Sequence, residues 1–135
     1  MSAVRTHRDL LVWQKAVSLA GKIYRTTQRF PNPDRHVLSV QMRRASISIP
    51  SNIAEGAARN SRAEYLRFLN IARGSLSELE TQLHITVQLG LVDPSTNLEE
   101  DVAEVGRLLS ALHRRLREHR ERSRGFERAR NPSGH

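Results

Sequence analysis

The chain has 135 residues, a net charge of +8 and no cysteine. This length allows one domain with a modest core, and the lack of cysteine excludes disulfides and thiolate metal sites. No segment approaches the roughly 20 apolar residues that a membrane helix needs, and the N-terminus lacks the apolar run of a signal peptide. We therefore expect a single cytoplasmic domain without a membrane partner, built from long helices.

The positive charge is concentrated near the C-terminus, where eight arginines stand against three glutamates between His113 and Arg130. A basic end favours an anionic partner, RNA more than DNA, and a merely solvated charged tail is the alternative. The arginines expected to contact nucleic acid are Arg43, Arg59, Arg62, Arg67, Arg114, Arg115, Arg117, Arg120, Arg122 and Arg124.

The first half of the chain predicts two helices. Residues 1–7 precede the first periodic segment, and we expect them to be disordered. One face of largely apolar residues predicts a helix from about Arg8 to Arg29. This face consists of Leu10, Trp13, Ala16, Val17, Ala20, Ile23, Tyr24 and Thr27. A Phe-Pro-Asn-Pro turn then leads into a second helix from about Pro33 to Arg59.

The second predicted helix is apolar on two flanks and polar between them. One flank contains Ile49 and Ile53, and the other repeats every seven residues at Val40, Ile47 and Ala54. The polar stripe between them consists of Gln41, Arg44, Ser48, Asn52, Glu55 and Arg59. We expect this stripe to lie in a seam, because both flanks require cover.

Charged groups in such a seam need partners, and we expect Arg67, Arg73 and Glu78 of the next helix to supply them. Two interpretations stay open for the seam: an internal hydrogen-bond network that fixes the helix register, or a polar functional site. Pro50 also allows two interpretations. The helix kinks there, or it stops and restarts; the unbroken stripes favour the kink.

A third helix is predicted from about Arg62 to Leu89. Ser61 and Glu64 form a capping-box pattern before it, and Gly90 is the left-handed residue expected after its end. A stripe of small residues on this helix would let another helix approach closely, either the second helix or a neighbouring subunit. It consists of Asn70, Gly74, Ser77 and Thr81.

A fourth helix is predicted from about Asn97 to Arg122, with Gly125 ending it. Apolar residues follow a heptad spacing along it, at Leu98, Val102, Val105, Leu109, Leu112 and Leu116. Four long helices with short connections predict an all-α, up-down-up-down four-helix bundle over residues 8–124. Residues 125–135 would form a basic flexible tail.

Several segments resemble the bacterial four-helix-bundle family first noticed inside intervening sequences of 23S ribosomal RNA genes. They are Val12-Trp13-Gln14-Lys15-Ala16, Phe30-Pro31, Gln41-Met42-Arg43-Arg44-Ala45, Ser48–Gly56, Phe68–Leu76 and Glu78–Gln82. The resemblance covers roughly residues 9–92, and it implies a four-helix protomer and a homopentamer. It also implies similarity to the accessory protein of diversity-generating retroelements, which looks like a basic barrel that binds nucleic acid and a reverse transcriptase.

The sequence carries no motif for nucleotide binding, metal binding or nucleophilic catalysis. We therefore expect no cofactor, no metal and no catalytic residue, and a non-enzymatic oligomer that binds nucleic acid. The alternative is a scaffold that recruits a partner protein. A nuclease that uses Asn52 and Glu55 is disfavoured, because no catalytic constellation surrounds them.

Overall fold

The computed structural model describes residues 7–31 and 36–130, with the backbone alone at residues 9, 120–124, 126 and 127. Within these ranges the chain is all-α. After a short 3-10 turn, η1 (His7–Asp9), it forms α1 (Leu11–Thr27), α2 (His36–Ala57), α3 (Arg62–Gln88) and α4 (Leu98–Arg130). Residues 1–6 and 131–135, in which disorder was expected, lie outside the described ranges, but His7 belongs to η1.

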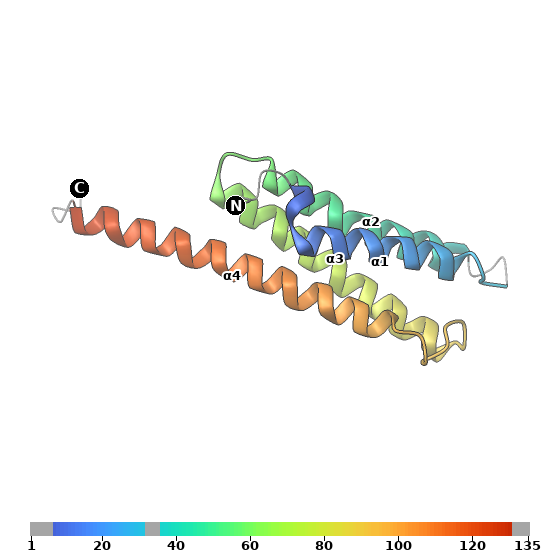
Figure 1. Ribbon diagram of the computed structural model, residues 1–135. Helices are drawn as coiled ribbons and strands as arrows, with labels where there is room; N and C mark the ends of the chain where they lie inside the picture. Colours follow the sequence, from blue (N-terminus) through green and yellow to red (C-terminus); the bar gives the residue numbers. More distant parts are fainter. Residues whose placement is uncertain (1–6, 32–35, 131–135) are drawn as a thin grey trace.

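The four helices form a bundle in which each helix packs against two others (Figure 1). α2 and α3 share the most extensive contact, α1 packs between α2 and α4, and α3 closes the ring against α4. The apolar stripes meet on the bundle axis. Residues with no exposed side-chain surface there are Ile23, Met42, Ile49, Ile53, Leu69, Ala72, Leu79 and Leu109. The predicted helical bundle is therefore confirmed.

The heptad pattern of α4 faces this core as predicted from Leu98 to Leu112, both of which are buried. Leu116 packs against its edge and His119 is exposed. The core ends near Leu116 because α3, which covers this face of α4, begins at Arg62. Leu76 on α3 lies opposite Gly106 on α4, so in antiparallel register Arg62 is level with the position of residue 120.

α2 runs as one helix through Pro50, which is buried, so the interpretation that the helix stops and restarts there is wrong. Among the described residues, only one of its two apolar flanks is fully covered. Val40 and Ile47 remain exposed. The expectation that both flanks are covered is therefore not met by a single copy of the chain.

The inward face of α1 contains the predicted Ala16, Ile23 and Thr27, but it is rotated relative to the predicted face. Val17 and Tyr24 are 43% and 40% exposed, whereas Val12 and Leu19 are buried. α1 contacts both α2 and α4, so the face between these two neighbours becomes the buried one. The spacing showed that α1 is amphipathic but placed the centre of its apolar face wrongly.

Both predicted end signals of α3 are present. The Ser61 hydroxyl accepts a hydrogen bond from the Glu64 backbone N–H at 3.2 Å. At the other end Gly90 has a φ of 72°. The Leu91 N–H donates to the carbonyl of Thr86 at 2.9 Å, which is the long bond of a Schellman motif. These bonds satisfy backbone groups that a helix end otherwise leaves open.

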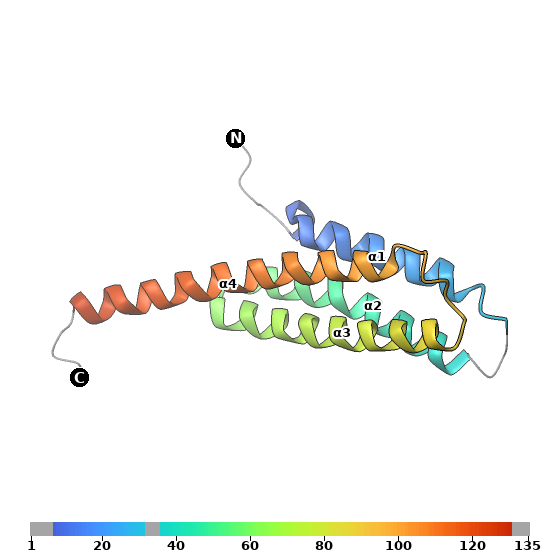
Figure 2. The ribbon, with the colours of Figure 1, turned by 90° about the horizontal axis from the view of Figure 1, so that it is seen from below.

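α4 continues through Gly125 to Arg130, so the prediction that Gly125 ends the helix is wrong. The surrounding arginines and glutamates are good helix formers, and one interior glycine costs only about 1 kcal/mol. The last turns of α4 consequently project past the ends of the other three helices (Figures 1 and 2). We call this projecting segment, residues 121–130, the overhang.

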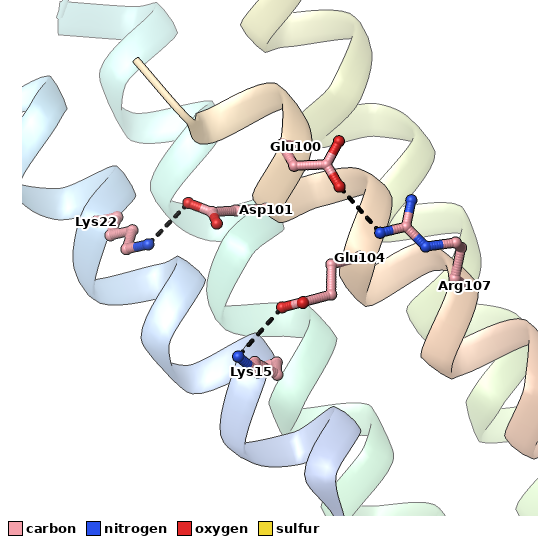
Figure 3. A network of polar contacts seen from close by, with 6 residues as sticks. All are labelled: Lys15, Lys22, Glu100, Asp101, Glu104 and Arg107. Atoms are coloured by element: carbon pink, nitrogen blue, oxygen red, sulfur yellow. Dashed lines mark hydrogen bonds and ion pairs between the residues drawn. The ribbon is translucent and has the colours of Figure 1, made fainter.

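Ion pairs connect the first and last helices (Figure 3). Lys22 Nζ lies 2.8 Å from Asp101 Oδ2, and Lys15 Nζ lies 3.3 Å from Glu104 Oε1. Both acids are on α4 and both lysines on α1, so the pairs bridge the contact between these two helices. No helix in the part of the chain described here is long and apolar enough to cross a bilayer.

Candidate functional site: the polar seam and the basic surfaces

The centre of the polar stripe of α2 meets α3 through a small hydrogen-bond network. The hydroxyl oxygens of Ser48 and Ser75 are 2.8 Å apart. Asn52 Nδ2 donates to the Ser48 carbonyl at 2.8 Å and to its hydroxyl oxygen at 3.0 Å. All three side chains are half-buried. The structure thus brings Ser48 and Asn52 together in a seam between two helices.

Ser75 is the partner that the sequence did not reveal. It stands seven residues after Phe68 and seven before Gln82, and all three face α2 or its edge. With Ser48 opposite Ser75 in antiparallel register, Gln41 is level with Gln82. Two polar residues seven positions apart on α3, Ser75 and Gln82, were the available signal, but the regular leucine spacing on the neighbouring face is the stronger pattern.

Gln82 carries an incomplete set of hydrogen bonds. Its Nε2 donates to Glu78 Oε1 at 3.1 Å, whereas its buried Oε1 has no partner among the described residues. An unpartnered buried amide oxygen costs about 1–3 kcal/mol. Gln82 Oε1 can therefore accept a hydrogen bond from one further donor.

The charged members of the stripe do not join the seam. Arg44 and Glu55 are exposed and have no hydrogen-bond or ion-pair partner within the described ranges. Arg73 donates to Asn70 on its own helix at 3.4 Å. The prediction that Arg67, Arg73 and Glu78 pair with the α2 stripe is wrong: Arg67 pairs with Glu64, Arg73 donates to Asn70 and Glu78 accepts from Gln82, all within α3.

Arg43 connects α2 to α1. Its Nε donates to Thr27 Oγ1 at 2.8 Å, and its guanidinium carbon lies 4.8 Å from the centre of the Tyr24 ring. Thr27 in turn donates to the Ile23 carbonyl at 2.8 Å. Arg43 was predicted to bind nucleic acid; the structure gives it a role in holding two helices together.

A second group of arginines surrounds Phe68 at the turn between α2 and α3. The guanidinium carbons of Arg59 and Arg67 lie 5.1 Å and 4.5 Å from the ring centre. Arg67 also donates to Glu64 at 2.9 Å. Arg62 is exposed at the start of α3. All three arginines are exposed, and two of them, Arg59 and Arg67, also contact the Phe68 ring.

Gly56 allows this turn to pack closely. A Cβ at this position would lie 2.9 Å from the Cβ of Phe68 and 3.0 Å from Cδ1 of Tyr65. Real Cβ atoms do not approach so near, so only glycine fits. The sequence showed this residue within a recognisable segment, yet it did not show what Gly56 contacts.

The arginines of α4 form the most accessible basic surface. Arg114, Arg115 and Arg117 are exposed and have no ion-pair partner in the described part of the chain. Arginine charge also affects His113, which lies on the same helix. Burial, followed by repulsion from Arg73 and Arg117, lowers the pKa of His113 below its usual 6.5. The side chains of Arg120, Arg122 and Arg124 lie outside the described set.

The arrangement offers positive charge and hydrogen-bond donors. Among the described residues, no three His, Asp or Glu side chains gather closely enough to hold a metal ion. Asn52 is engaged with Ser48, and Glu55 is exposed on the outer side of α2. Chemically, the surface suits the recognition of phosphate groups.

Comparison with known proteins agrees with the fold. A crystal structure of a protein of unknown function from the S23 ribosomal protein family of Bacteroides thetaiotaomicron superposes with a TM-score of 0.72 and 26% sequence identity. The match covers 77% of this chain and 96% of that one. No curated protein sequence matches the chain. Residues 8–111 match the 23S rRNA-intervening sequence protein family, and the chain therefore belongs to that family.

Proposed function

We propose that this protein is a non-enzymatic oligomer that binds RNA through the basic surface of α4. The observation that carries this proposal is a group of exposed arginines at the base of the overhang, Arg114, Arg115 and Arg117, which have no ion-pair partner among the described residues. Their guanidinium groups can contact phosphate oxygens in pairs of hydrogen bonds. The net charge of +8 supports attraction to polyanions over a longer range.

Self-association would multiply a modest basic patch. Large aliphatic side chains are exposed on the outer face of α2 and α3: Val37, Val40, Ile47, Ile71 and Ile85. A second copy on this face would cover the uncovered flank of α2, and we propose a homopentamer, the state implied by the family resemblance. Several copies that bind one RNA molecule gain affinity through effective concentration without any new contact.

Binding of a fluorescent RNA hairpin, followed by anisotropy across a salt series, tests the proposal. The Arg115→Gln/Arg117→Gln variant should weaken binding and reduce the slope of log affinity against log salt by about 1 for each phosphate that the variant no longer binds. The matched control is Arg25→Gln/Arg29→Gln, which removes the same charge from exposed positions at the end of α1.

The two outcomes are distinct. A salt slope reduced in the α4 variant and preserved in the control would support RNA binding at this surface. Absence of binding by the natural chain at low salt would overturn the proposal. The alternative, a scaffold for a partner protein, is favoured by the same exposed aliphatic face; it predicts that pull-downs recover a specific protein and that recovery survives nuclease treatment.

A further inference from the structure

A groove of about 630 Å³ runs between α3 and α4 on the side away from α1 and α2. Three guanidinium groups stand along it, from Arg73 on α3 and from Arg107 and Arg114 on α4. Glu80 is the single carboxylate among the described residues that line it. The groove is therefore a concave surface with excess positive charge.

Small side chains keep the floor of this groove low. Ser77, Ala103 and Ser110 lie along it, and Gly106 allows α3 and α4 to approach. A Cβ at Gly106 would lie 3.3 Å from Cδ2 of Leu76, so the two helices are in contact beneath the groove. The groove is thus a shallow channel over a closed helix contact, and the hydroxyl groups of the two serines add hydrogen-bond donors to it.

The three arginines keep donors available. Arg114 has no hydrogen-bond or ion-pair partner in the described part of the chain. Arg107 gives one N–H group to Glu100 at 2.9 Å, and Arg73 makes only a long bond to Asn70. A guanidinium has five N–H donors, so each can still bind an anion.

The spacing of the cations indicates a chain of phosphates rather than one phosphate. Arg107 and Arg114 are seven residues apart on α4, which corresponds to about 10 Å along the axis. Packed helices lie about 8–10 Å apart, so a channel between two of them admits one extended strand and not a duplex. None of the described lining residues is aromatic, so the bases find no stacking platform.

Negative charge at one end of the groove repels anions. Glu80 also lines the adjoining pocket of about 480 Å³, together with Glu99. The other end, at Arg114, leads directly to Arg115, Arg117 and the overhang. An anionic strand that lies in the groove therefore enters from the C-terminal side of α4 and stops at Glu80.

We infer that the α3–α4 groove binds the sugar–phosphate backbone of single-stranded RNA, with Arg73, Arg107 and Arg114 contacting successive phosphates. This inference rests on the proposed function and names the part of the RNA and the surface involved. Because contact is made to phosphates alone, binding is independent of sequence.

The test uses the full-length protein and a labelled single-stranded oligouridylate, with anisotropy measured across a salt series. Each phosphate bound on a single strand contributes a slope of about −0.7, so removal of one such interaction weakens binding about fivefold at 0.1 M salt. Arg73→Ala/Arg114→Ala should therefore weaken binding about 25-fold. The control Arg25→Ala/Arg29→Ala removes equal charge away from the groove and should change affinity far less.

A third variant tests the shape of the groove without changing its charge. Ser110→Leu fills the floor and keeps every arginine, so it should weaken binding while circular dichroism and melting stay unchanged. Unaltered binding by Ser110→Leu would overturn the inference about the groove, as would an equal loss of affinity in the two double arginine variants. Neither result would contradict the proposed function. No binding of either RNA by the natural chain would overturn both.

Discussion

At the residue scale, two glycines in neighbouring helices show how position decides the effect of one methyl group. Gly56 faces Phe68 and Tyr65 across the α2–α3 turn, whereas a Cβ at Gly74 would have no neighbour within 4 Å. Both residues are helical and neither has a positive φ. The difference between them is therefore one of packing alone.

Gly56→Ala should destabilise the protein by about 1–3 kcal/mol, because the added methyl group overpacks a closed contact. Gly74→Ala should stabilise it by about 0.5–1 kcal/mol, because alanine loses less backbone entropy than glycine in a helix. Urea unfolding followed by circular dichroism measures both. Equal effects of the two changes would contradict the packing explanation.

The pKa of His113 makes stability depend on pH. Burial and the charges of Arg73 and Arg117 lower this pKa below 6.5 in the folded chain, so the unfolded chain takes up the proton first. Stability is then lost as pH falls from 6.5 toward the lower folded pKa, and it is retained above 6.5.

Replacing His113 by glutamine removes this proton-binding difference. His113→Gln should therefore flatten the fall in melting temperature between pH 7 and pH 5 relative to the natural chain. The measurement is a set of thermal melts at several pH values. Parallel curves for the two proteins would show that other groups dominate acid sensitivity.

Residue-scale site features were the hardest to predict. The sequence identified Ser48 and Asn52 as members of a polar stripe, but their partner Ser75 depends on the rotation of α3 against α2. Arg73 and Glu78 instead form hydrogen bonds with residues of α3 itself. Helical spacing gives the face of each helix and leaves the angle between helices open. Arg43 was likewise predicted to bind nucleic acid. Its contact with Thr27 joins two different helices, so the spacing within one helix does not reveal it.

At the element scale, helix ends were predicted where local chemistry decides them. Ser61 caps α3 and Gly90 closes it, because both act on backbone groups within a few residues. Gly125 misled the prediction for α4. A glycine marks a helix end only when the chain turns there, and the overhang continues in a run of strong helix formers.

The contact between α2 and α3 offers a test at this scale. Asn52→Leu removes two hydrogen bonds to Ser48 and places an apolar group beside the Ser48–Ser75 pair. It should lower the free energy of unfolding by about 1 kcal/mol or more. Ser51→Ala, one residue earlier and exposed, is the control and should have little effect. Binding of RNA by α4 should survive the Asn52 change.

At the scale of the whole molecule, the uncovered flank of α2 is the feature that one copy of the chain does not explain. Val40 and Ile47 are 37% and 43% exposed, and Ile71 and Ile85 are exposed on the neighbouring helix α3. Contiguous aliphatic patches of this kind commonly mark an interface.

Ile47→Glu should reduce the oligomer to smaller species, because a carboxylate would have to be buried in the new interface. Light scattering coupled to size exclusion gives the mass directly. Val17→Glu changes an equally exposed residue on α1 and should leave the mass unchanged. A natural chain that is monomeric at every concentration would contradict the proposed assembly.

The overhang of α4 grows from a helix that the bundle has already formed. An isolated helix of this length would be marginal in water, because the first turn is costly to nucleate. Here that turn is supplied by the packed part of α4, so the overhang should fray gradually from its C-terminal end instead of melting as a unit. Phosphate groups that neutralise its arginines would shift this fraying boundary outward. The length of the ordered arm would then report how much RNA is bound, and amide hydrogen exchange along it would show the boundary move.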